Sequence, residues 1–257
     1  MLEALAGGVW EHVLNEKSIR IKMREENAMK TIGLIGGMSW ESTVTYYKVI
    51  NETVKEELGG LHSAKILMYS VDFDEIERCQ SSGDWGRSAA VLSDAAKRLE
   101  AAGADFIVIC TNTMHKVAPE IRKCLSIPLL HIAEVTAQRL KEAGITTVGL
   151  LGTCYTMTQP FYIDVLVREG IDVLVPGEKA VQVVNDIIFD ELCIGIARES
   201  SKEVLLDTIR QLESRGAQGV ILGCTELGLL VGPEDVKLPV FDTAIIHARE
   251  AALEAIR

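Results

Sequence analysis

Short apolar runs rich in β-branched residues recur along the chain from residue 31, and longer stretches with helical spacing of apolar positions separate them. Such runs predict buried parallel strands, and the stretches between them predict amphipathic helices, for example 87–103 and 201–218. Strands that alternate with helices predict parallel βαβ units in a doubly wound α/β fold. The predicted strands are 31–37, 64–72, 105–113, 128–132, 146–153, 171–176, 219–226 and 239–243.

The pattern of the first half of the chain is repeated in the second half. TIGLIGGMSWEST (31–43) resembles TVGLLGTCYTMTQ (147–159), and AGADFIVICTNTMH (102–115) resembles RGAQGVILGCTELG (215–228), with nearly the same displacement along the chain. Two matched pairs at one displacement predict two pseudo-symmetric parallel-sheet domains, with the active site in the cleft between them. The predicted division is an N-terminal extension outside the fold (1–28), a first lobe (29–133) and a second lobe (134–238). The C-terminal segment, about 239–257, is a candidate to pack back on the first lobe.

Composition narrows the class of protein. The 257 residues include 26 basic and 37 acidic residues, a net charge of −11 that argues against a nucleic-acid or acidic-membrane partner. No apolar run approaches the roughly 18 residues of a membrane span. The six cysteines form no CxxC pair and match no zinc-binding spacing, so we expect reduced thiols, a cytoplasmic protein and no metal.

Polar residues that could bind a ligand or transfer protons lie where the predicted strands end. In open parallel sheets ligands bind beyond the carboxyl ends of strands, and polar clusters follow four of them, at 36–39, 110–113, 152–156 and 223–226. The repeat places Thr111 and Cys224 on opposite sides of one cleft, the arrangement that inversion of a carbon centre by two proton-handling groups requires. A helix start after Cys224 is expected to lower its thiol pKa and make it a base. Since strand side chains alternate, Cys110 is expected to point away from the cleft if Thr111 points in, with the opposite register left open.

Several motifs together carry a family resemblance. GGMSWESTVTYY, GGLHSA, SVDF, CTNTMH, FDELC, GCTE and LPVFDT follow one another between about residues 29 and 248. In this order they resemble the aspartate/glutamate/hydantoin racemases, and most closely the bacterial L-aspartate/glutamate-specific racemases. The resemblance implies a homodimeric racemase that needs no cofactor and interconverts the enantiomers of aspartate, glutamate or both. It also implies that Met38 and Gln80 line the substrate pocket.

Two positions depart from the family pattern. Thr111 stands where many members have a cysteine, so we expect an asymmetric acid/base pair with Cys224 as the stronger base. Val183 stands near the position where members often have a lysine, and Lys179 is the nearest basic residue, which leaves open what holds a distal carboxylate.

Without a cofactor, the α-carboxylate of the substrate must be stabilised by hydrogen bonds as the α-proton leaves. The candidate donors are Asn112, Thr113, Thr225 and neighbouring amides. Glu226 fits a place in the site or in a first helical turn equally well, and His115 is a candidate to orient a proton relay. Cys154 lies at the symmetry position of Ser39, whereas Cys79, Cys124 and Cys193 are expected to be core or incidental.

Two alternative functions stay open from the sequence. One is a decarboxylase or isomerase of the same fold that uses a single cysteine on a small dicarboxylate. The other is a catalytically silent protein that binds an acidic amino acid. Exchange of the α-proton with solvent distinguishes a racemase from the silent protein.

Overall fold

The computed structural model describes residues 29–257, so the predicted N-terminal extension, residues 1–28, lies outside the described residues. The described chain forms two sheets of four parallel strands. The first contains β1 (Thr31–Gly36), β2 (Lys65–Ser70), β3 (Phe106–Ile109) and β4 (Leu129–Leu130), in the order β2-β1-β3-β4. The second contains β5 (Thr147–Gly152), β6 (Asp172–Leu174), β7 (Val220–Gly223) and β8 (Val240–Asp242), in the order β6-β5-β7-β8. The second sheet repeats the strand order of the first, which confirms the predicted α/β fold with two pseudo-symmetric lobes.

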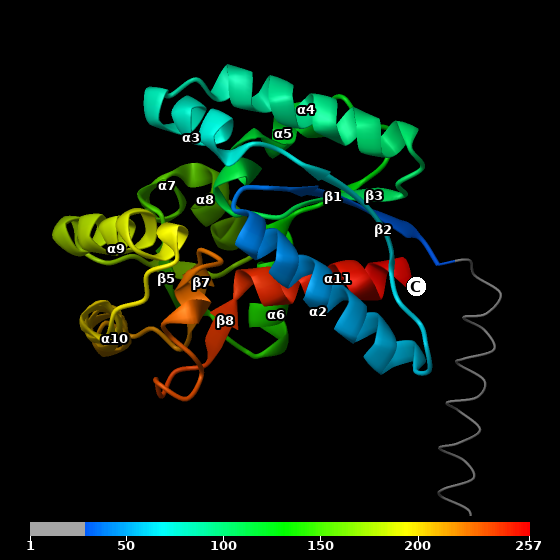
Figure 1. Cartoon of the computed structure of the whole chain (residues 1–257). Helices are drawn as coiled ribbons and strands as arrows, with labels where there is room; N and C mark the ends of the chain where they lie inside the picture. The colour runs from blue at the N-terminus through cyan, green and yellow to red at the C-terminus, as the bar shows by residue number, and fades with distance from the viewer. Residues whose placement is uncertain (1–28) are drawn as a thin grey trace, which may run out of the picture.

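Helices cover both faces of the first sheet (Figure 1). Alternation along the strands explains this, because Ile35 and Ile107 point to one face and Leu34 and Val108 to the other. On the first face lie α3 (Phe73–Ser82), α4 (Trp85–Ala101), the 3₁₀ helix η1 (Thr113–Val117) and α5 (Ala118–Arg122); on the second lie α2 (Trp40–Leu58) and α11 (Thr243–Ala255).

The end of the chain ties the two lobes together. β8 pairs with β7 and so completes the second sheet, whereas α11 packs against α2 and the first sheet. The buried face of α11 consists mostly of small residues, which let neighbouring helices approach closely. They are Ala244, Ala248, Ala251, Ala252 and Ala255, all buried.

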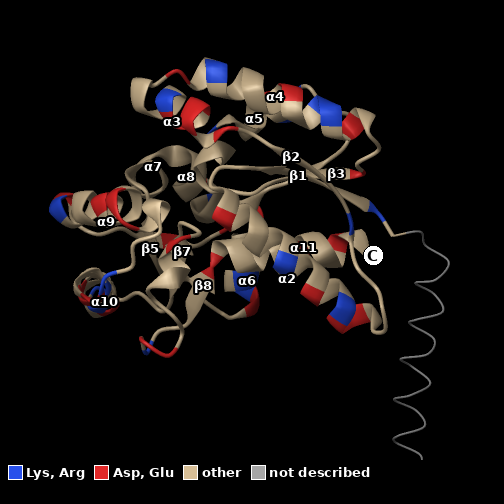
Figure 2. Cartoon of the chain, in the orientation of Figure 1, with Lys and Arg blue, Asp and Glu red and all other residues tan. Residues whose placement is uncertain are grey.

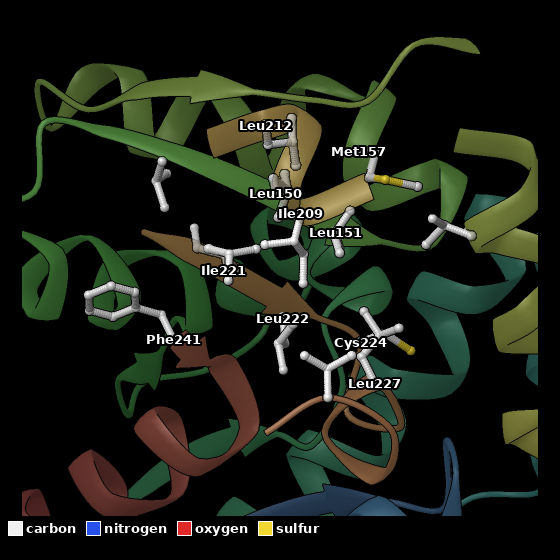
Figure 3. Packing of buried hydrophobic residues seen from close by; sticks show 14 of the residues in the cluster. Leu150, Leu151, Met157, Ile209, Leu212, Ile221, Leu222, Cys224, Leu227 and Phe241 are labelled. Carbon is white, nitrogen blue, oxygen red and sulfur yellow. The ribbon is translucent and has the colours of Figure 1, made fainter. Parts of the chain in front are cut away.

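The second lobe has a continuous apolar core (Figure 3). Leu150 from β5, Leu222 from β7 and Leu212 from α10 are fully or almost fully buried in it. Cys224 lies at the end of this core, one residue beyond β7, so the packed strand fixes where its thiol emerges. The helical segments of this lobe are α6 (Ile132–Glu142), α7 (Cys154–Thr158), α8 (Pro160–Arg168), α9 (Glu178–Asp190), η2 (Leu192–Ile194), α10 (Glu199–Ser214) and η3 (Leu227–Leu229).

The turn between β1 and α2 requires glycine. Gly37 has φ of +92°, and a Cβ there would lie 2.2 Å from the Val71 carbonyl oxygen. This close approach explains the glycine at position 37, and the turn lets Ser39 begin α2 as its N-cap. Among the helices of residues 29–257, none is long and apolar enough to span a bilayer.

Candidate active site

A small cavity of about 30 Å³ lies between the lobes, where the carboxyl ends of β1, β3, β5 and β7 meet. All seven residues predicted for the site line it: Met38, Gln80, Thr111, Asn112, Thr113, Cys224 and Thr225. Eight further residues complete the lining: Ser39, Phe73, Thr153, Ile188, Phe189, Cys193, Gly223 and Glu226. The space holds about one or two water molecules, which is less than the volume of an amino acid.

The Cys224 thiol faces a buried carboxylate. Its Sγ donates a hydrogen bond to Glu226 Oε2 over 3.0 Å, and the Thr225 hydroxyl donates to the same oxygen over 2.7 Å. Glu226 is only 6% exposed and is part of the cavity wall. Of the two readings that the sequence left open for Glu226, the structure therefore favours a place in the site.

The expected lowering of the Cys224 pKa is wrong. Burial raises the pKa of the Cys224 thiol well above its usual value, and the neighbouring charge of Glu226 raises it further. The helix that was expected to lower it is the three-residue η3, which begins only at Leu227. The thiol is therefore protonated in this structure, and Glu226 is its hydrogen-bond acceptor.

The other oxygen of Glu226 reaches across to the first lobe. Ser39 and Ser42, in the first turn of α2, donate to Glu226 Oε1 over 2.7 and 2.9 Å. Four hydrogen-bonding side chains, two from each lobe, therefore surround the two oxygens of Glu226. Neither Ser39 nor Ser42 was predicted to hold a catalytic group, although the motif MSWES contains a Ser-x-x-Ser spacing at a helix start.

Thr111 is held by its main chain. The His115 ring donates from Nδ1 to the Thr111 carbonyl oxygen over 2.8 Å, and His115 Nε2 accepts from the Ile132 amide over 3.2 Å. Burial lowers the pKa of His115 to about 4, so the ring is neutral and both of its nitrogens are used. His115 does not line the cavity, and its contacts orient the Thr111 backbone rather than a proton relay.

Asn112 presents a free acceptor to the cavity. Its Nδ2 donates to the Thr243 hydroxyl over 2.9 Å, whereas its buried Oδ1 has no hydrogen-bond partner. Thr243 in turn donates to the Leu222 carbonyl oxygen, which fixes the orientation of the amide. A buried carbonyl oxygen without a donor in a cavity wall is a candidate to accept a hydrogen bond from a ligand.

Other hydrogen bonds cross the cleft beside the cavity. Thr113 and Thr153 share one between their hydroxyls at 3.2 Å, and Tyr155 donates its hydroxyl to the Gln80 carbonyl oxygen over 3.2 Å. Together with the bonds to Glu226, they hold the lobes in contact around the site.

The remaining cysteines differ in position. Cys110 is fully buried in the cluster beneath α2 and α11, where burial raises the pKa of its thiol, and it does not line the cavity. The expected register, with Thr111 toward the cleft, is therefore the one observed. Cys154 lies outside the cavity lining, whereas Cys193, expected to be core or incidental, lies in it.

Neither of the two α9 positions considered in the sequence supplies a positive charge for the side-chain carboxylate of an acidic substrate. Val183 is 43% exposed and Lys179 lies in the first turn of α9; neither lines the cavity. In the described part of the chain, Glu226 is the one ionisable acid or base of the lining besides the thiols.

The fold and the cavity define a two-lobed α/β protein with a buried site for a small molecule between its lobes. The family description Asp/Glu/hydantoin racemase matches residues 35–251. The chain belongs to this family, as its motifs predict.

Solved structures and a characterised relative agree with this membership. A candidate Asp/Glu racemase from Yersinia pestis is 54% identical, with a TM-score of 0.85 over 89% of this chain and 100% of that one. An aspartate racemase homologue from Pyrococcus horikoshii is 38% identical, with a TM-score of 0.79 over the same shares. The broad specificity amino-acid racemase RacX of Bacillus subtilis is 25% identical over 85% of this chain and 95% of its own length.

Proposed function

We propose that this protein is an amino-acid racemase that needs no cofactor and exchanges the α-proton between two groups, Cys224 and Thr111. The observation that carries the proposal is that equivalent strand ends of the two lobes bring these side chains to one buried cavity. A carbanion formed there is planar, and a proton returned from the opposite lobe gives the other enantiomer.

The proposed reaction begins with the thiol proton. When Cys224 acts as base, Glu226 Oε2 accepts the Sγ proton, and the thiolate then removes the α-proton of the substrate. Asn112 Oδ1 receives a hydrogen bond from the α-ammonium group, and the hydroxyls of Thr113 and Thr225 stabilise the α-carboxylate as it gains enediolate character. Thr111 donates its hydroxyl proton to the opposite face and regains one from water, and the proton that Glu226 releases neutralises the hydroxide that this leaves.

The pair is unequal, because an alcohol is a far weaker acid than a thiol. The equilibrium constant between two enantiomers is one, so kcat/KM is equal in the two directions. We therefore expect kcat and KM to be larger together in the direction in which Cys224 removes the proton. Aspartate and glutamate are the substrates that the family resemblance predicts, while RacX carries a broader name.

Proton exchange in D₂O tests the proposal. L-amino acids and their D-enantiomers are incubated separately with the wild-type protein and with Cys224→Ser and Thr111→Ala, and the α-proton signal is followed by NMR. Loss of the signal with appearance of the other enantiomer supports racemisation. A Thr111→Ala variant with full activity in both directions would overturn the two-group assignment, and exchange without inversion would leave Cys224 acting alone.

The homodimer stays a prediction of the resemblance. Trp40, Val44 and Tyr47 are 65, 56 and 53% exposed and follow one face of α2, as an apolar contact surface would. Light scattering of the wild-type protein and of Val44→Glu measures the state directly, and a monomeric wild type would refute it.

A further inference from the structure

The cavity wall beyond the reacting groups is apolar or uncharged. Met38, Phe73, Ile188 and Phe189 contribute thioether, aromatic and aliphatic surface, and Gln80 contributes an amide. Such a wall favours contact with apolar groups or neutral hydrogen-bonding groups of a ligand.

The electrostatic environment of the cavity disfavours a second carboxylate on the substrate. The α-carboxylate already brings one negative charge next to Glu226, which is buried. The N-terminus of α2, which would otherwise attract an anion, is taken up by Glu226 through Ser39 and Ser42.

The helix that forms the facing wall adds to this effect. Ile188 and Phe189 belong to the last turn of α9, which contains no basic residue, so the negative end of the helix dipole lies beside the cavity. The basic residue of this helix, Lys179, lies at its opposite end (Figure 2). Two cations at the start of α10 are already paired, Arg198 with Glu191 and Lys202 with Asp235.

We propose that this site prefers amino acids with uncharged side chains over aspartate and glutamate. This inference rests on the proposed racemase function and departs from the acidic substrates that the resemblance predicts. A buried carboxylate without a counter-ion is costly, whereas the isosteric amide of glutamine or asparagine meets the same wall without that cost.

Isosteric pairs test the preference directly. The kcat/KM for α-proton exchange is measured for L-glutamine against L-glutamate and for L-asparagine against L-aspartate. We expect the amides to be favoured by about tenfold or more, the order of effect that an unpaired charge produces in a partly screened site. Equal rates, or faster exchange of the acids, would overturn the inference and leave the racemase intact, whereas no exchange with any of the four would overturn both.

A variant that supplies the charge gives an independent test. Phe189 is half-buried at the edge of the cavity, so a lysine there reaches the site while its ammonium keeps contact with water. Phe189→Lys is expected to shift the amide-to-acid ratio toward the acids by about tenfold. The matched control, Phe189→Met, changes the size of the wall but not its charge and is expected to keep the wild-type ratio; an unchanged ratio in Phe189→Lys would contradict the inference.

Discussion

The Glu226→Gln substitution tests whether this carboxylate controls the thiol of Cys224. Glu226 accepts hydrogen bonds from Cys224 and Thr225 on one oxygen and from Ser39 and Ser42 on the other. Glutamine has the same shape and keeps one oxygen acceptor, and the serine hydroxyls can rotate to accept from its amide. The variant is therefore expected to fold.

The magnitude follows from the bond that is lost. A hydrogen bond to a charged group contributes about 1.5–3 kcal/mol, and the Cys224 thiol loses an acceptor of this kind. If the carboxylate receives the thiol proton, the exchange rate falls by about ten- to 150-fold. The pKa of Cys224 should fall in this variant, because the charge of Glu226 helps to raise it in the wild-type protein.

Two assays therefore give results of opposite sign. NMR exchange in D₂O should slow, while alkylation of Cys224 by iodoacetamide, followed by peptide mass spectrometry, should reach its half-maximal rate at lower pH. Glu234→Gln, an equal change of charge at an exposed position of the same lobe, should alter neither. Exchange within about twofold of wild type together with an unchanged alkylation profile would refute the coupling.

Three further predictions concern the fold. Cys110→Ser places a hydroxyl in a fully buried apolar cluster and should lower the urea-measured free energy of unfolding by about 1–3 kcal/mol without changing exchange per folded molecule; a loss of exchange would return Cys110 to the site. Gly37→Ala, whose Cβ would meet the Val71 carbonyl oxygen, should destabilise the turn before Ser39 and lower the melting temperature, and an unchanged melting temperature would contradict this. Burial lowers the pKa values of His115, His131 and His247 to about 4, 2 and 3, so below about pH 6.5 the unfolded chain binds more protons than the folded one. Each of these three histidines should therefore lower the free energy of unfolding by about 2 kcal/mol between about pH 7 and pH 5. Equal urea midpoints at the two pH values would refute this.

The arrangement of the lobes was predictable because it depends on periodic features. The apolar runs gave the strands, and the internal repeat implied equal strand orders, as observed in β2-β1-β3-β4 and β6-β5-β7-β8. Strand alternation also placed Cys110 and Thr111 on different sides. These predictions need only local pattern and the rule that ligands bind at the carboxyl ends of parallel strands.

The chemistry of Cys224 was not predictable in the same way. Its pKa depends on burial and on Glu226, and the length of η3 decides whether a helix dipole acts on it. The contacts of Ser39 and Ser42 with Glu226 join residues more than 180 positions apart, as their separations of 187 and 184 indicate. No sequence period reports such contacts, because they arise only when the lobes close.

Closure of the lobes and protonation of the thiol are therefore linked. The cavity of about 30 Å³ is smaller than an amino acid, so we expect substrate entry to separate the lobes and to break the bonds from Ser39 and Ser42 to Glu226. Such an opening would also bring water to Cys224 and so remove the burial that is the largest cause of its raised pKa. A substrate thus meets a thiol that ionises more readily in the open form, and closure then desolvates the thiol and Glu226 together around the α-carbon. Glu226 accepts hydrogen bonds from both lobes and from the Cys224 thiol. It is therefore the group best placed to hold the thiol proton when the lobes come together around a substrate.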